Sequence, residues 1–328
     1  MKLPLLSILM TFLYTSAHAQ QDSIKEVPIT KVAIATLNIE GFPDFLAADG
    51  KDVWITNKKK VEKLSLGHST PVMTVAVSQP CGAMVTGFGS LWVANCTDKA
   101  IYRIDRKSGN VIASIVTGLA SKYGELSLAV GAGSVWVLSD SAGILTRINP
   151  QTNTIQAIIK VKPFSYCAAF GYGAVWITNC GQIQYHRNGE VTVRDPGSVQ
   201  KIDPKTNQVV ATITVGFAPN FLATGEKGIW VLNEGDGSVS RINPNTNQMT
   251  ATIDAKVSGW GGDITAGAGR VWLRGNKTVF LVAVDPKRNA VSKRYSPLCG
   301  SGSVRVAKNI VWVSAHDINT VWAIKYQP

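Results

Sequence analysis

Apolar and polar positions along the chain repeat in one pattern, centred on a tryptophan that follows an aliphatic residue. The repeated tryptophans, spaced 38 to 54 residues apart, are Trp54, Trp92, Trp136, Trp176, Trp230, Trp272 and Trp312. After most of them come two alternating or β-branched segments around a Pro-x-Thr-Asn turn, as in 200–213 and 240–253. Such flanks around turn residues are typical of β-hairpins.

Each repeat therefore predicts four short strands: an inner strand, the tryptophan strand and the two arms of the hairpin. Four-stranded units that recur at about this spacing are typical of β-propellers. Stacking such sheets around an axis covers their apolar faces and leaves few open edges. We predict an all-β fold, a single seven-bladed propeller over residues 20–328, with the repeated tryptophans packed between blades.

The first strand of this domain is predicted to close the ring. The last repeat ends at 321–326 without a following strand, so its sheet lacks one member. A suitable segment stands near the other end of the chain, where 31–39 precedes Pro43 as 209–215 precedes Pro219. We expect about residues 31–39 to complete the last blade.

Composition and the leading segment indicate a folded, exported protein. Of 328 residues, 45% are hydrophobic and 16% charged, which excludes a disordered chain, and the formal net charge is +12. Residues 1–19 have the basic start, apolar core and small-residue cleavage site of a signal peptide. We expect a periplasmic or secreted monomer, in a compartment where cysteines can pair. No apolar run has the length of a transmembrane helix.

The repeated strings resemble those of the YVTN-type propellers, also called the virginiamycin B lyase-like family. The resemblance lies in VWITN at 53–57 and 175–179, in LWVAN and IWVLN, and in the RI(D/N)P-x-TN turns. It extends over nearly the whole chain after residue 19. The resemblance implies a seven-bladed propeller. It further implies either a binding protein of the cell envelope or a lyase that uses a metal with His and Glu near the central funnel.

At one rim of such a ring, the fourth residue after each tryptophan is expected to face the start of the inner strand. The predicted pairs are Pro43 with Lys58, Cys81 with Cys96, Glu125 with Asp140, Ser165 with Cys180, Pro219 with Glu234, Gly261 with Asn276, and Ser301 with His316. Directly opposed cysteines on neighbouring strands lie within disulfide range, so we predict a Cys81–Cys96 bridge. A Cys167–Cys180 bridge would need a bulge, and it stays open whether these two cysteines are paired or free.

Carboxylates gather at the same rim. Like charges directly opposite on a sheet are unfavourable, so we expect Glu125 and Asp140 to be neutralised by a cation or a basic side chain. With Glu234 and Asp263 they could supply oxygen ligands to Ca²⁺ or Mg²⁺. In the alternative that we favour, Lys122, Arg274 or Arg305 neutralises them. No Walker loop, HExxH or CxxC motif occurs, so no other cofactor is indicated.

An insertion after Trp176 and several basic residues add candidate ligand contacts. Residues 183–195 alternate on either side of Asn188-Gly189, which predicts a projecting hairpin. The proposed ligand-binding residues are Lys58, Lys122, Tyr185, Arg187, Arg194 and Arg274. Because a positive concave surface attracts anions, we predict an anionic small molecule, a polysaccharide or an envelope protein as partner, ahead of nucleic acid.

Two functions follow. The first is an envelope protein that binds an anionic ligand or partner at the funnel rim. The second is a metal-assisted lyase or hydrolase with His316 or His186 as acid or base. We favour the first, because it needs no catalytic group and the chain has only 4 histidines.

Overall fold

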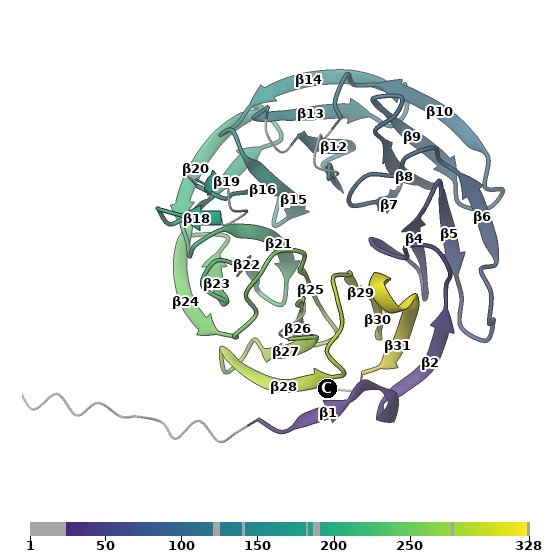
Figure 1. Ribbon diagram of the computed structural model, residues 1–328. Helices are drawn as coiled ribbons and strands as arrows, with labels where there is room; N and C mark the ends of the chain where they lie inside the picture. Colours follow the sequence, from purple (N-terminus) through teal and green to yellow (C-terminus); the bar gives the residue numbers. More distant parts are fainter. Residues whose placement is uncertain are drawn as a thin grey trace, which may run out of the picture.

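The structure, a computed structural model, describes residues 24–120, 125–139, 142–181, 183–185, 191–276 and 279–326. Seven four-stranded antiparallel sheets surround a central axis, and each runs from an inner strand to an outer one (Figure 1). The helical elements in these ranges are two single-turn 3-10 helices, and neither has the length or apolar composition to cross a bilayer. The predicted seven-bladed propeller is confirmed.

Blades 1 to 4 are made of the following strands, from the axis outward: β3 (Leu46–Asp49), β4 (Asp52–Asn57), β5 (Lys60–Leu64) and β6 (Met73–Ala76); β7 (Val85–Gly87), β8 (Ser90–Asn95), β9 (Ala100–Asp105) and β10 (Val111–Val116); β11 (Ser127–Gly131), β12 (Ser134–Ser139), β13 (Ile144–Asn149) and β14 (Thr154–Lys160); β15 (Ser165–Gly171), β16 (Ala174–Asn179), β19 (Ser198–Asp203) and β20 (Gln208–Thr214). Blades 5 and 6 follow with β21 (Pro219–Gly225), β22 (Gly228–Asn233), β23 (Ser238–Asn243) and β24 (Gln248–Asp254), then β25 (Asp263–Gly267), β26 (Arg270–Arg274), β27 (Leu281–Asp285) and β28 (Ala290–Ser296).

Blade 7 contains the ring closure. Its strands β29 (Val304–Ala307), β30 (Ile310–Ala315) and β31 (Thr320–Lys325) are completed by β2 (Ala33–Asn38), as predicted. The sequence did not predict the preceding strand β1 (Glu26–Pro28), which pairs parallel with β28 at the outer edge of blade 6. Between them, in the 3-10 helix η1 (Ile29–Lys31), Ile29 is fully buried against Trp272 and Phe280. The leading segment therefore contacts two blades.

All seven repeated tryptophans are fully buried, which confirms their predicted place in the core. In blades 2 to 6 the indole N–H donates to the carbonyl of a glycine five residues earlier, as from Trp136 to Gly131 at 3.0 Å. A Cβ on Gly131 would lie 2.0 Å from the Phe170 ring in the next blade. The glycine thus allows two blades to approach closely.

A basic side chain covers each tryptophan of blades 2 to 5 and joins its blade to the next. The Arg147 guanidinium lies 4.9 Å from the Trp136 ring and donates to the Pro204 carbonyl and the Asn207 side chain, in the outer turn of blade 4. The other three residues with both contacts are Arg103, Lys201 and Arg241. We call these four residues the basic locks. They explain why the repeats share a basic residue and a Pro-x-Thr-Asn turn.

The predicted insertion in blade 4 forms an antiparallel pair, β17 (Ile183–Tyr185) with β18 (Val191–Val193), while its turn at Asn188-Gly189 lies outside the described residues. The rim register needs correction in three blades. In blade 2, Pro80 lies opposite Asn95, so Cys81 and Cys96 are not directly opposed although they are bridged. Irregular pairing in the inner strands places Ser165 opposite Asn179 and Pro219 opposite Asn233. The predicted partners Cys180 and Glu234 are each one residue off, because the bulged strand holds an extra residue.

Candidate functional site

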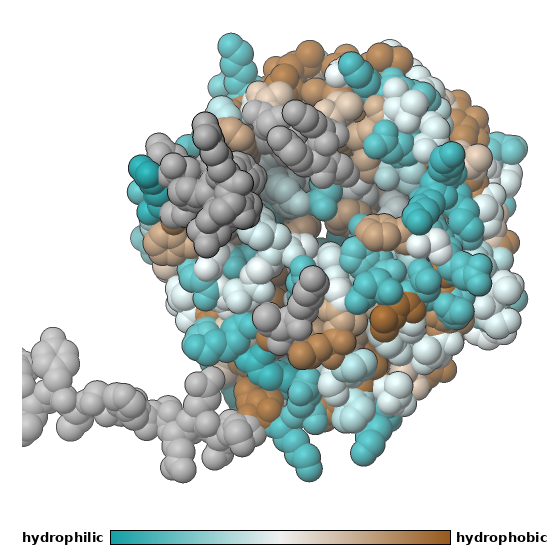
Figure 2. Space-filling view, in the orientation of Figure 1, coloured by the Kyte–Doolittle hydropathy of each residue, from teal (hydrophilic) through white to brown (hydrophobic). Residues whose placement is uncertain are grey.

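Two connected hollows lie along the axis of the ring, and the face drawn in Figure 2 is hollowed near its centre. A channel of about 320 Å³ is lined by the inner strands of all seven blades. A second hollow of about 580 Å³ is formed by loops of blades 7, 1 and 2, and we call it the mouth pocket. Phe45 and Glu125 line both, so the mouth pocket leads into the channel.

Asn57, the last residue of the first VWITN string, shapes one wall of the mouth pocket. Its side-chain oxygen accepts hydrogen bonds from the backbone N–H groups of Phe42 and Lys58, at 2.6 and 2.7 Å. Its amide group donates to the Glu40 carbonyl and to the Glu62 carboxylate, both at 2.8 Å. The motif asparagine therefore fixes the entry loop and the following turn in one arrangement.

That turn carries two lysines over the pocket. Lys58 and Lys59 are both exposed and both line the hollow. Among the ion pairs between described residues, neither ammonium group takes part, whereas the next residue, Lys60, pairs with Glu62 at 2.8 Å. The two charges thus remain available to a ligand.

Asp44 and His316 also line the mouth pocket. Burial, reinforced by Asp263 and opposed by Arg274, raises the pKa of Asp44 to about 7. Burial also lowers the pKa of His316, with Asp317 acting against the shift and Arg274 reinforcing it, so its imidazole is neutral at pH 7. The ring is held edge-on to Phe42 with centroids 4.0 Å apart, and Nδ1 is buried without a hydrogen-bond partner among the described residues.

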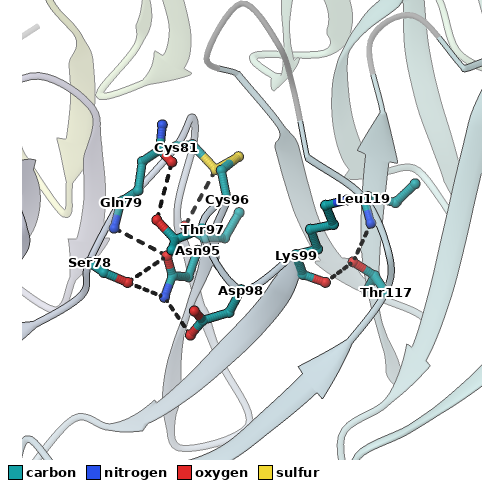
Figure 3. Close-up of a disulfide and its surroundings, with 11 residues drawn as sticks. Ser78, Gln79, Cys81, Asn95, Cys96, Thr97, Asp98, Lys99, Thr117 and Leu119 are labelled. Carbon is teal, nitrogen blue, oxygen red and sulfur yellow. Dashed lines mark hydrogen bonds between the residues drawn. A yellow bond between two sulfur atoms is a disulfide. The ribbon is translucent and has the colours of Figure 1, made fainter.

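The predicted Cys81–Cys96 disulfide is present, and Cys81 forms part of the pocket wall (Figure 3). Beside it, Asn95 occupies the position that Asn57 has in blade 1. Its side-chain oxygen accepts a hydrogen bond from the Gln79 N–H at 3.1 Å, and its amide group donates to Asp98 at 2.9 Å. The bridge and this asparagine together hold the loop 78–82 at the pocket edge.

The other cysteines are free thiols, so the open question of a Cys167–Cys180 bridge is answered against pairing. Cys180 Sγ lies 2.8 Å from the Asn220 side-chain oxygen, and Cys167 Sγ lies 3.8 Å from the Leu222 carbonyl. Burial raises the pKa of Cys167 to about 11 and that of Cys180 to about 12. These thiols are therefore protonated and poorly nucleophilic at neutral pH.

The carboxylates predicted to bind Ca²⁺ or Mg²⁺ do not share a site. Asp263 pairs with Arg305 and also accepts from Ser303, Glu125 accepts from the Tyr166 hydroxyl, and Glu234 accepts from Asn220. Asp140 lies outside the described residues. Within the described part of the chain, no three His, Cys, Asp or Glu side chains are placed to hold a metal ion. For Asp263, the favoured alternative of neutralisation by Arg305 is confirmed.

Arg274 was predicted to face a ligand, and this is wrong. Its side chain is completely buried and donates to the carbonyls of Ser314, Gly300 and Phe280. The guanidinium also lies 3.3 Å from Cys299 Sγ. The sequence showed that Arg274 is charged and lies near the rim. It did not show that a loop folds over the Arg274 side chain and buries it. Arg274 joins blades 6 and 7.

The remaining predicted contacts are only partly placed. Arg194 is exposed after β18, and Tyr185 ends β17. Lys122, His186 and Arg187 lie outside the described residues. Sequence analysis missed Asp44 as a pocket residue, although it follows Pro43 of a predicted rim pair.

Fold and site together define a seven-bladed β-propeller with a polar pocket at the mouth of its channel. Residues 53–200 match the family model of a repeat of unknown function (DUF6923), and no curated protein matches the sequence significantly. Virginiamycin B lyase from Staphylococcus aureus is similar in structure, with a TM-score of 0.70 and 15% identity over 89% of this chain and 98% of that one. A catalytically inactive histidine-to-alanine variant of that lyase, with quinupristin, aligns with a TM-score of 0.70 and 14% identity over 88% and 96%. The Pan2 WD40 domain of Neurospora crassa has a TM-score of 0.66 at 10% identity, over 88% and 92%. At these identities the likeness shows the fold.

Proposed function

We propose that this propeller is an exported binding protein of the cell envelope, whose anionic ligand occupies the mouth pocket. The observation that carries the proposal is the pair of exposed lysines, which form no ion pair with any described residue, over a hollow of about 580 Å³. Hollows of this size hold small molecules, and a few converging polar groups give them specificity. Lys58 and Lys59 would contact the anionic group, a carboxylate or phosphate of a small molecule or of a polysaccharide end.

The other polar groups of the pocket suit the same ligand. Because burial raises the pKa of Asp44 to about 7, its carboxyl can be protonated near neutral pH and can then donate a hydrogen bond to an anion. The neutral His316 imidazole adds a further donor or acceptor without adding charge. Asn57 and the disulfide keep the pocket walls in place before the ligand arrives, which lowers the entropy cost of binding.

Export is part of the proposal and is supported by the leading sequence. Residues 1–19 have the features of a signal peptide, and the Cys81–Cys96 disulfide would persist in an oxidising compartment. Sequencing the amino terminus of the protein from its native host tests this part. A start at Gln20 in an extracytoplasmic fraction is expected, and an intact leader in the cytosol would overturn it.

Titration calorimetry with galacturonate and with inorganic phosphate tests the binding site. Charge reversal at Lys58 or Lys59 should weaken binding of the bound anion at least about tenfold, because attraction becomes repulsion. Lys205→Glu, an exposed lysine in the outer turn of blade 4, is the matched control and should leave binding unchanged. Equal losses in all three variants would show long-range charge effects instead of a site at the mouth.

An enzyme of the lyase or hydrolase class is the second candidate, favoured by one observation. His316 and Asp44 share the pocket, and the shifts of their pKa values suit a neutral base and a proton donor. The described carboxylates do not fit a divalent ion, so we assign no step to a metal. Incubation with pectin-like and lactone substrates decides between the two: turnover that His316→Gln abolishes favours the enzyme, and binding without turnover favours the binding protein.

A further inference from the structure

A third hollow lies at the rim of blades 5 and 6, away from the mouth pocket. Its volume is about 340 Å³, and its lining includes Phe217, Glu234, Asp236 and Trp260. Trp260 is not one of the seven blade tryptophans, and the residue is 41% exposed. We call this hollow the Trp260 pocket. Trp260 is thus outside the buried core and lines the hollow together with two acidic residues.

Glu234 is a buried acid that pairs with no Lys or Arg among the described residues. Only 3% of the residue is exposed, and its carboxylate accepts hydrogen bonds from the Gly262 N–H at 2.6 Å and from the Asn220 side chain. Both donors are neutral, and neither Glu234 nor Asp236 forms an ion pair within the described ranges. A buried carboxylate is unfavourable unless a positive charge compensates it. Consistently, burial raises the pKa of Glu234 to about 7 despite the two hydrogen bonds.

The surrounding backbone holds both carboxylates in fixed positions. A Cβ on Gly262 would lie 2.5 Å from Glu234 Oε1, and one on Gly216 would lie 2.6 Å from Asp236 Oδ2. Asp236 accepts from the N–H groups of Phe217 and Ser238, at 3.0 and 2.9 Å. The glycines therefore let the chain close around the two acids.

We propose that the Trp260 pocket binds an organic cation, a quaternary or alkylated ammonium group. The Glu234 and Asp236 carboxylates would supply the opposite charge, and the faces of Trp260 and Phe217 would cover the methyl groups. Aromatic rings attract such cations through their negative faces, and the attraction grows when water is excluded. A calcium ion would need six or more oxygen ligands, whereas this wall is partly aromatic and its acids already accept N–H groups. This site is independent of the anion site at the mouth.

Titration calorimetry of the whole chain after residue 19 tests the proposal, with tetramethylammonium and choline as probes. Saturable binding is expected for both. A neutral analogue of choline, in which carbon replaces the ammonium nitrogen, should bind at least about tenfold more weakly because it lacks the charge. Equal binding of the neutral analogue, or no saturable binding of either cation, would overturn the proposal. Competition by Mg²⁺ or Ca²⁺ at equal concentration would overturn it in favour of a metal site.

Two substitutions place the site. Trp260→Ala and Glu234→Gln should each weaken choline binding about five- to tenfold, whereas Glu26→Gln, an exposed glutamate on β1, should leave it unchanged. Thermal unfolding of each variant reports whether it is folded. Trp260→Ala removes a partly exposed side chain, so we expect this variant to stay folded. It can therefore test the site even if Glu234→Gln unfolds the protein. Choline binding that survives Trp260→Ala unchanged would contradict the assignment.

Discussion

The ring has a regular arc and an irregular one, held together by different contacts. In blades 2 to 5, the locked arc, a basic lock covers each tryptophan and reaches the turn of the next blade. In blades 6, 7 and 1 with residues 26–38, the closing arc, the residues that face the tryptophans are Ala283, Ala323 and Lys63. Lys63 turns back to Asp49 of its own blade, at 2.9 Å. The closing arc therefore needs other contacts between blades.

Individual contacts replace the locks there. Buried Arg274 joins blade 6 to blade 7, and the Trp312 indole donates to the Lys51 carbonyl of blade 1 at 3.0 Å. The Ser314 hydroxyl donates to the Asp44 carbonyl at 2.6 Å. Most of the mouth pocket lies in this arc. The repeated contacts between blades make the ring rigid. The mouth pocket is formed by residues that are not repeated in the other blades, so it lies where the repeated contacts are missing.

Removing the leading segment should have the largest effect on stability. Deletion of residues 24–38 takes away β1, η1 and β2, leaving the outer edges of blades 6 and 7 uncovered and Ile29's core position empty. We expect loss of cooperative thermal unfolding. Ile29→Ala alone should cost about 2–5 kcal/mol of the free energy of unfolding. A deletion variant with unchanged Tm would show that the locked arc alone sustains the ring.

Loss of the disulfide should come next, at the boundary between the arcs. The bridge closes a loop of 15 residues, for which the entropy model gives about 3 kcal/mol. Denaturant unfolding of the Cys81→Ser/Cys96→Ser double variant measures it. Cys299→Ser, which changes a free thiol, is the control for serine at a buried position. An equal loss in the control would assign the effect to the hydroxyl groups and not to the missing bridge.

Breaking one lock should cost less. Arg147→Ala removes the contact with Trp136 and two hydrogen bonds to blade 4, about 2 kcal/mol in total. Arg147→Lys should recover part of this, because Lys201 forms the same contacts in blade 4. Arg288→Ala, at an exposed arginine in a blade 6 turn, should change stability by less than about 0.5 kcal/mol. Similar values for Arg147→Ala and Arg288→Ala would remove the physical basis for separating the arcs.

The free energy of unfolding should also depend on pH, through two single buried carboxyl groups. Asp44 and Glu234 have pKa values of about 7 in the folded protein, above those of unfolded carboxyls. Between about pH 4.5 and 7 the folded state therefore binds more protons than the unfolded one, so these groups make stability fall as pH rises. In Asp44→Asn the slope should be shallower; an identical profile would refute the assignment to Asp44.

The features of the fold that recur in every repeat could be predicted from the sequence. Blade number, the buried tryptophans and closure by β2 follow from periodic patterns. The Cys81–Cys96 bridge was predicted from direct opposition of the two cysteines; the bridge is present, although Pro80 lies opposite Asn95 there and the pairing is shifted. The locks went unrecognised because each links residues 43 to 60 positions apart, although both partners were visible in the motif. Arg274 was misplaced because a one-dimensional register says nothing of a loop that covers a side chain. In blades 4 and 5 the bulges changed the register, since nothing in the alternation marks an extra residue.

Hydrogen–deuterium exchange with and without a bound anion tests the central claim most directly, namely that the site lies where the repeat breaks. With galacturonate or phosphate at saturation, protection should increase in 42–45, 56–59 and 78–82, the segments that line the mouth pocket. The outer turns and strands of blades 3 to 5 should exchange as before. Protection concentrated in those blades, with the mouth segments unchanged, would contradict the account.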